Sequence, residues 1–213
     1  MKSRNNKLII TSIEEQKKKG RFNIFIDGEY AFGLYKETIY DFGLRTKDEL
    51  TEQQIEEIKS YDEINFGKKV AMSYLNYKQR TEKEVLKKLH SHKLSEGSIE
   101  KILTFLKSFK FINDESYAKL FVESKKLLKP EGRKSLKIRL AQKGINKEIT
   151  DRSVRENYSE EEEFMKAKEL YGKYKKKVKG KNEMDKKQKC YRFLLSKGFS
   201  YDLISSVMKL EES

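Results

Sequence analysis

The sequence has very few of the residues that form disulfides, bind transition metals or interrupt helices. Its 213 residues include one cysteine, one proline, two histidines and no tryptophan. The single Cys190 excludes an intramolecular disulfide and is typical of a protein from a reducing cytoplasm. Two histidines and one cysteine are too few for the usual structural zinc site. The scarcity of proline predicts a largely helical chain.

Long apolar segments and catalytic motifs are also missing. No run of 18 apolar residues occurs, and the basic stretch 1–6 lacks the apolar core of a signal peptide, so we expect a soluble cytoplasmic protein. There is no Walker loop, no Gly-x-Gly-x-x-Gly and no Gly-x-Ser-x-Gly. His90 and His92 are two residues apart, so on a helix they point to different faces and form no metal-ligand pair. The sequence therefore predicts no enzyme activity, no metal and no cofactor.

What the sequence has in excess is positive charge. Lys and Arg number 48 and Asp and Glu 34, a formal net charge of +14. Residues 1–65 carry 11 basic and 13 acidic side chains, so the whole excess lies in 66–213. The densest stretches are 119–147, with ten basic and two acidic residues, and 164–197, with thirteen and three. Lysines that only maintain solubility would be mixed with acidic residues. This distribution instead predicts a polyanionic partner, and favours nucleic acid over a membrane surface.

The first 35 residues have the composition of strands. Leu8–Ile13 and Arg21–Ile26 are rich in β-branched and aromatic residues. Asp27-Gly28 separates the second segment from Glu29–Phe32, and this dipeptide is the strongest short-range signal for a β-hairpin. We therefore expect a small three-stranded antiparallel meander, which needs neighbouring helices to pack against.

The rest of the chain repeats one helical unit three times, with a period of roughly 50 residues. The segments 88–94, 139–145 and 193–199 align position for position. Each segment has two apolar residues five positions apart, a helix with a buried-type alanine before it and an apolar helix after it. The pairs are Leu89 with Leu94, Leu140 with Ile145, and Leu194 with Phe199, and the alanines are Ala71, Ala118 and Ala167. Such repeats predict a stacked array whose surface serves for binding.

The predicted fold is mainly α. We expect an elongated, right- or left-curved array of three tandem three-helix repeats, preceded by a small N-terminal antiparallel β-meander and linking helices. The N-terminal module is expected at 1–65 and the repeats at 66–112, 113–158 and 159–213, with a boundary at 62–67 after which a helix over 66–77 begins the repeats. Residues 127–132 are expected to form a loop. Polar residues that cap helices mark the expected helix starts: Thr51, Thr81 with Glu84, Ser95 or Ser98, Asn113 or Asp114, Asn146 and Ser200.

The candidate binding residues are basic side chains that recur around the second helix of each repeat, because recurrence would align them as a stripe along the array. Tyrosines stand among them and have flat rings that stack on bases or fill partner pockets. For Tyr77 the core and contact interpretations are balanced. The candidates are Tyr77, Lys78, Arg80, Lys87, Lys88, Lys125, Lys126, Arg133, Lys134, Lys137, Arg139, Lys176, Lys186, Lys187, Lys189 and Arg192.

Three segments resemble the RecX regulatory proteins of bacteria. They are Tyr74–Leu89, Phe111–Val122, and Gly132 followed by Leu140–Ile145. The resemblance covers about 66–210, and the strand-rich N-terminus is similar to that of the longer Gram-positive members. Gln79 stands where a proline is common, and Asn113 where an aspartate is common.

This resemblance implies a non-enzymatic bacterial protein that binds the RecA recombinase. Such proteins are thought to lie in the groove of the RecA–DNA filament, where they block its growth and lower ATPase and strand-exchange activity. The implied partners are therefore RecA and single- and double-stranded DNA, the implied role is control of DNA repair, recombination and the SOS response, and we expect a monomer. A stand-alone basic DNA- or RNA-binding helical-repeat protein is the alternative that the charge pattern leaves open.

Overall fold

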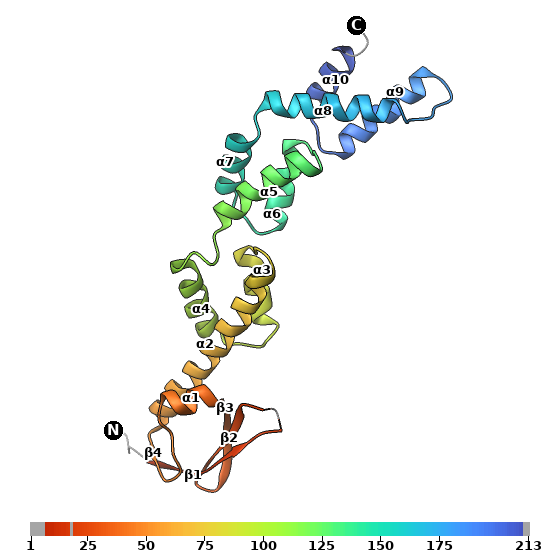
Figure 1. Ribbon diagram of the computed structural model, residues 1–213. Coiled ribbons are helices and arrows are strands. Elements are labelled where there is room, and N and C mark those ends of the chain that lie inside the picture. The colour runs from red at the N-terminus through yellow and green to blue at the C-terminus, as the bar shows by residue number, and fades with distance from the viewer. Residues whose placement is uncertain (1–6, 18, 211–213) are drawn as a thin grey trace, which may run out of the picture. The chain divides into compact units, whose positions relative to one another are not determined.

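The β-rich N-terminus forms the antiparallel sheet that its sequence predicts. The computed structural model describes residues 7–17 and 19–210, so the stretch 1–6 lies outside the described residues (Figure 1). The three expected strands are β1 (Leu8–Glu15), β2 (Arg21–Ile26) and β3 (Glu29–Tyr35). Asp27 and Gly28 have φ of 50° and 87°, as the tight turn between β2 and β3 requires. A fourth strand, β4 (Glu49–Leu50), extends the sheet to the order β3-β2-β1-β4. It was not predicted, because two residues are too few to show an alternating pattern.

One face of the sheet packs against helices, as a sheet this small needs. Ile10, Ile24 and Leu34 are fully buried, and they form one core with Ile55 and Ile58. The last two residues belong to helix α2 (Glu52–Tyr77), which follows the short helix α1 (Lys36–Asp41). Their burial against the strands confirms that neighbouring helices support the meander.

Helix α2 starts where expected but does not end where expected. The Thr51 hydroxyl accepts a hydrogen bond from the Gln54 backbone N–H at 3.2 Å, and so caps the helix. The helix then runs without interruption for 26 residues, so the separate helix predicted over 66–77 is wrong and 62–67 is not a break between helices. Gly67 does not break the helix, because its role is in packing. A Cβ there would lie 2.3 Å from Ile102 Cδ1 and 2.8 Å from Leu94 Cδ1.

Eight further helices carry the repeats within the described part of the chain. They are α3 (Glu82–His90), α4 (Glu96–Ser108), α5 (Asp114–Leu128), α6 (Arg133–Gln142), α7 (Lys147–Asn157), α8 (Glu160–Lys175), α9 (Glu183–Ser196) and α10 (Tyr201–Leu210). Helix α5 extends to Leu128, so the loop expected at 127–132 is two residues shorter. None of these described helices is both long enough and apolar enough to cross a membrane.

Most of the predicted caps are confirmed. Thr81 and Glu84 exchange both hydrogen bonds of a capping box, at 3.2 and 3.3 Å. Asn113 and Asn146 accept backbone N–H groups at the starts of α5 and α7. The Ser159 cap of α8 was not predicted, although Ser159 and Glu162 also form a capping box.

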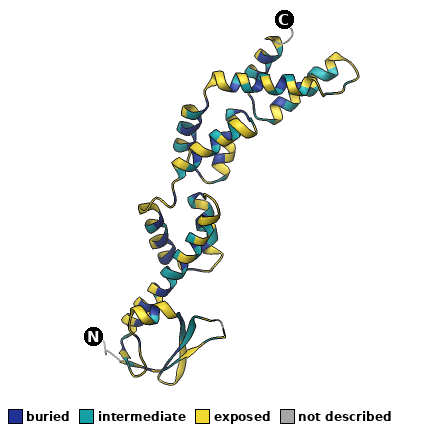
Figure 2. Cartoon of the chain, in the orientation of Figure 1, coloured by how far each residue is buried: buried dark blue, intermediate teal, exposed yellow. Residues whose placement is uncertain are grey.

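The repeated pattern corresponds to repeated cores. Ala71, Ala118 and Ala167 have no exposed surface, and the apolar pairs of all three repeats are buried. Figure 2 shows the buried residues on the helix sides that face their neighbours. Gly144 and Gly198 follow α6 and α9 with φ of 87° and 82°, a left-handed conformation that favours glycine. The protein is therefore mainly helical, with a small N-terminal antiparallel sheet and three-helix repeat domains.

By its internal contacts the chain forms two units. The first unit comprises residues 1–77 and 88–106, and the second comprises 78–87 and 107–213. Helix α3 contributes its first turns to the second unit and its end to the first.

Within the second unit, the second helix of one repeat begins against the turn that follows the second helix of the next repeat. The Thr81 hydroxyl, at the start of α3, donates to the Lys143 carbonyl after α6 at 2.8 Å. The Gly132 N–H, at the start of α6, donates to the Lys197 carbonyl after α9, also at 2.8 Å. The same contact therefore occurs twice. In both cases a backbone carbonyl of one repeat accepts a hydrogen bond from the preceding repeat.

Candidate functional site

The second unit contains a groove with basic side chains along its walls. Its volume is about 430 Å³. The first turns of α3, the middle of α5 and the end of α6 form its walls. The lining residues are Lys83, Glu84, Lys87, Phe121, Arg139, Gln142 and Lys143. We call this the basic groove.

One end of the basic groove is fixed by an ion pair. Lys143 Nζ lies 2.6 Å from Glu84 Oε1, and the backbone carbonyl of Lys143 accepts the Thr81 hydroxyl. Burial alone would raise the pKa of Glu84, but the hydrogen bonds from Lys143 and Thr81 outweigh burial and lower that pKa. The hydrogen bond with Glu84 raises the pKa of Lys143 in turn. Both groups are therefore charged at neutral pH, and their positions are set by the fold.

A second carboxylate, Glu131, pairs with two cations in or beside the basic groove. Its side chain is buried, with only 8% of its surface exposed. Glu131 Oε2 lies 3.1 Å from Arg139 Nε, and Oε1 lies 3.7 Å from Lys125 Nζ. Lys125 Nζ also lies 5.6 Å from the centre of the Phe121 ring. This arrangement keeps two cations beside an aromatic wall of the groove.

The groove keeps an excess of positive charge after its internal pairs are counted. Lys83, Lys87, Lys125, Arg139 and Lys143 lie in or beside it, with Glu84 and Glu131 as the compensating carboxylates. Among the residues that the structure describes, Lys83 Nζ approaches one backbone carbonyl, that of Gln142, at 3.5 Å, and no carboxylate. Lys87 forms no ion pair with any residue that the structure describes. These two lysines, one helical turn apart on α3, are therefore available to an external anion.

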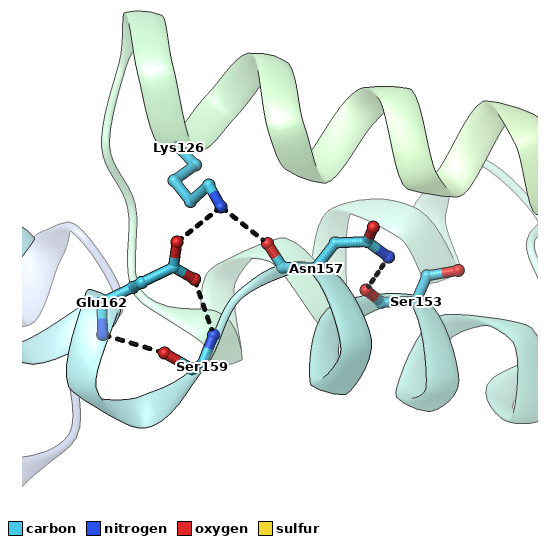
Figure 3. Close-up of polar contacts among 5 residues, drawn as sticks. All are labelled: Lys126, Ser153, Asn157, Ser159 and Glu162. Atoms are coloured by element: carbon cyan, nitrogen blue, oxygen red, sulfur yellow. Dashed lines mark hydrogen bonds and ion pairs between the residues drawn. The ribbon is translucent and has the colours of Figure 1, made fainter.

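Several predicted cations instead connect helices. Lys126 Nζ bridges the Glu162 carboxylate at 2.8 Å and the Asn157 carbonyl at 3.0 Å, between α5 and the start of α8 (Figure 3). Arg133 pairs with Glu160 at 2.9 Å and Lys137 with Asp151 at 2.6 Å. These side chains hold neighbouring helices together, so their charges are already compensated within the fold.

In the third repeat, two of the predicted cations form ion pairs within helix α9. Lys186 pairs with Glu183 at 2.6 Å, and Lys189 with Asp185 at 2.9 Å. Lys187 lies beside Met184 and Tyr191 in a separate groove of about 490 Å³ between α9 and α10. The other predicted side chains here, Lys176 and Arg192, are exposed, as is Lys134 in α6.

The candidates around the end of α2 fall into both units. Tyr77 and Lys88 belong to the first unit, and Lys78, Arg80 and Lys87 to the second. Tyr77 is 83% exposed, which excludes the core interpretation for its ring. Lys88 Nζ lies 5.9 Å from the centre of the Tyr74 ring.

Sequence reasoning missed Lys83, Phe121, Gln142 and Lys143 as groove residues. A signal for Lys143 was present, because it occupies the same position of the aligned segments as Lys197. Lys83 lies between Thr81 and Glu84, the two residues of the capping box. The sequence pattern there indicates a helix start and gives no sign that Lys83 lines a groove. Among the described residues, no three His, Cys, Asp or Glu side chains form a group that fits a metal ion.

Family models match three parts of the chain. The model for the N-terminal domain of regulatory protein RecX matches residues 8–51. The models for the second and third three-helix domains of RecX match residues 113–153 and 160–208. These matches include the sheet and two of the helical repeats.

Two curated proteins and one solved structure are similar over nearly the whole chain, and a second solved structure is similar over 70% of it. The regulatory protein RecX of Clostridium botulinum is 35% identical over 208 residues, covering 94% of each chain. That of Leuconostoc mesenteroides is 34% identical, covering 93% of this chain and 74% of the relative. A crystal structure of regulatory protein RecX has a TM-score of 0.71 and 31% identity, and covers 95% of this chain and 99% of its own. A crystal structure of RecX from Lactobacillus salivarius has a TM-score of 0.65 and 32% identity, over 70% of this chain and 96% of its own.

Proposed function

The chain belongs to the RecX family of regulatory proteins, and from this we propose that it regulates the RecA recombinase without being an enzyme. It binds the recombinase–DNA filament and inhibits filament assembly, ATPase activity and strand exchange. Its place is the bacterial cytoplasm, where it acts as a monomer in the control of DNA repair and recombination.

The observation that carries this proposal is the excess charge of the basic groove. Five cations lie there with two carboxylates, so the groove attracts a polyanion. Lys83 and Lys87 are free to form charge-assisted hydrogen bonds with phosphate oxygens. Lys143 and Arg139 are already oriented by their carboxylate partners, so ordering them costs little side-chain entropy on binding. Contacts of this kind position a protein on DNA without reading its sequence, as a regulator of a filament on any DNA requires.

The test is the effect of the full chain on RecA from the same organism. ATPase activity and strand exchange are measured on single-stranded DNA with fewer copies of this protein than of the recombinase. We expect both activities to fall at substoichiometric ratios, because one bound copy blocks the addition of many subunits. No inhibition at any ratio up to one copy per recombinase subunit would remove the proposal.

A salt series separates this function from stand-alone DNA binding. Binding to naked DNA through about six phosphate contacts should weaken by roughly 10³-fold between about 50 and 200 mM salt. A filament binder also contacts the recombinase, so inhibition should persist at salt that abolishes binding to naked DNA. If inhibition and naked-DNA binding disappear together, the protein acts by covering DNA.

A further inference from the structure

The connection between α8 and α9 carries a dense group of lysines. Residues 173–189 contain nine lysines and only two carboxylates, those of Glu183 and Asp185. Five of the lysines fall within the seven residues 175–181, and all five are exposed. They are Lys175, Lys176, Lys177, Lys179 and Lys181. We call residues 175–181 the lysine loop, which lies where α8 ends and the chain turns toward α9 (Figure 1).

The charges of the lysine loop are not compensated within the fold. Glu183 pairs with Lys186 at 2.6 Å, and Asp185 pairs with Lys189 at 2.9 Å. Both carboxylates of this stretch are therefore paired with lysines of α9. In the part of the chain that the structure describes, none of the five loop lysines forms an ion pair. The surface here keeps an excess of positive charge, which attracts a polyanion.

The backbone of the lysine loop is held against α9. The Lys181 N–H donates to Asp185 Oδ2 at 2.9 Å, and the Lys179 carbonyl accepts a hydrogen bond from Lys189 Nζ, also at 2.9 Å. Val178, the one apolar residue of the loop, packs against the core of the third repeat. The fold therefore keeps the five lysines together at the surface, although like charges this close repel each other.

Stabilisation of helix α8 does not explain the whole group. Cations in the last turn of a helix interact favourably with its dipole, and Lys173 and Lys175 occupy that turn of α8. Lys177, Lys179 and Lys181 lie beyond the last residue of the helix. The effect of the dipole falls off within the last turn, so these three lysines are better explained by an external ligand.

The chemistry of the lysine loop favours duplex DNA as this ligand. Protein interfaces have apolar and aromatic centres and are poor in lysine, whereas phosphate groups are bound by lysine and arginine. Sites for single-stranded DNA add aromatic rings on which the bases stack. The loop itself has no ring, and the adjacent Tyr174 ring stacks on that of Phe193 with centroids 4.1 Å apart. A duplex presents closely spaced phosphates and keeps its bases inside.

We propose that the lysine loop is a second nucleic-acid site, which binds the phosphates of a DNA duplex while the basic groove holds a single strand. The two sites share no element, because the groove is formed by α3, α5 and α6 and the loop joins α8 to α9. Phe121 gives the groove the ring that the loop lacks. One molecule then holds two DNA segments at once. Only the single-strand part of this inference rests on the proposed function.

Duplex affinity of the full chain, measured without recombinase, tests the lysine loop. The variant is Lys177→Gln, Lys179→Gln, because both side chains lie beyond α8. We expect roughly tenfold weaker binding to a labelled duplex of about 30 base pairs, and a salt slope lower by about 2, since each lost phosphate contact removes about one. Affinity for oligothymidylate should change less than about threefold. An unchanged duplex affinity, or equal losses for the two ligands, would overturn the proposal.

The matched control is Lys101→Gln with Lys119→Gln. It lowers the net charge by the same amount through exposed lysines of α4 and α5. We expect duplex affinity within about twofold of that of the original chain. The same loss in both variants would mean that total charge determines binding. Polyglutamate that displaced the duplex as effectively as unlabelled duplex, at equal charge, would indicate an acidic protein as the ligand and would also overturn the proposal.

A bridging assay tests whether the two sites act together. Biotinylated oligothymidylate on beads captures the protein, and the labelled duplex is then added. We expect the beads to retain duplex, and the Lys177→Gln, Lys179→Gln variant to be captured equally well but to retain at least about fivefold less duplex. Captured protein that retains no duplex would overturn the second site. Protein that binds duplex in solution but is not captured would overturn the single-strand role of the basic groove.

Discussion

For the double variant Lys83→Glu, Lys87→Glu, we expect the concentration that gives half-maximal inhibition of RecA to be roughly 30 times higher than for the unsubstituted chain. The change converts five cations and two carboxylates at the basic groove into three and four. The groove then repels phosphate instead of attracting it, and a loss of about 2 kcal/mol corresponds to that factor. Neither lysine forms an ion pair within the described chain, so the helical content should not change. ATPase inhibition curves at about 100 mM salt provide the measurement.

The matched control is Lys101→Glu with Lys119→Glu. Both lysines are exposed on helices, α4 and α5, and neither lines the basic groove. The control lowers the net charge by the same amount, so it reports the effect of overall charge alone. We expect less than a threefold change. Equal loss of inhibition in the two double variants would mean that total charge, and not the basic groove, determines binding.

Gly132→Ala is expected to destabilise the second unit by about 3 kcal/mol. A Cβ at this position would lie 2.1 Å from the Gly198 carbonyl oxygen and 2.5 Å from the Phe199 nitrogen. These atoms belong to the backbone, so they cannot move aside as a flexible side chain does. The expected loss of stability is therefore at the upper end of the range for overpacking substitutions. The φ of Gly132 is −68°, which alanine adopts freely, so the expected loss is steric. Urea unfolding followed by circular dichroism measures it.

Gly172→Ala is the control for this variant. Gly172 lies inside α8, and a Cβ there would have no neighbour within 4 Å. Alanine has the higher helix propensity, so this variant should be about as stable as the original or gain up to about 1 kcal/mol. An unchanged unfolding midpoint for Gly132→Ala would show that α6 and the turn after α9 are not in close contact.

The sequence was sufficient to predict the elements whose signals are local. Apolar pairs such as Leu140 and Ile145 identify the buried faces, because a buried position has to be apolar in every repeat. Thr81 and Asn146 identify helix starts, because a side-chain oxygen satisfies a free N–H there. These signals depend on residues close together in the chain.

Other features depend on residues far apart in the chain and were missed. Gly67 was interpreted as part of a helix boundary, but it is a helical position that Ile102 and Leu94 approach closely. A glycine has the same sequence signal in both roles, and only the packing partner distinguishes them. The two-residue strand β4 depends likewise on pairing with β1.

The candidate site was predicted only in outline. The basic segments are evident from composition, and Lys87 and Arg139 do line the basic groove. The sequence does not show which cations are compensated inside the fold. Lys126 and Glu162, for example, are 36 residues apart and pair through the contact of α5 with α8. The division between structural and available cations therefore requires coordinates.

Site-specific photo-cross-linking tests the central claim most directly, namely that the basic groove contacts the nucleic acid of the filament. A benzophenone amino acid replaces Phe121, which lines the basic groove, or Leu120, which is exposed and does not line it. Each variant is irradiated on RecA filaments assembled on labelled single-stranded DNA. We expect cross-links to DNA from position 121 and at least about fivefold fewer from position 120, because the benzophenone reacts only with atoms in contact with it. Equal yields from both positions, or no DNA cross-link from position 121 in a variant that still inhibits RecA, would contradict the claim.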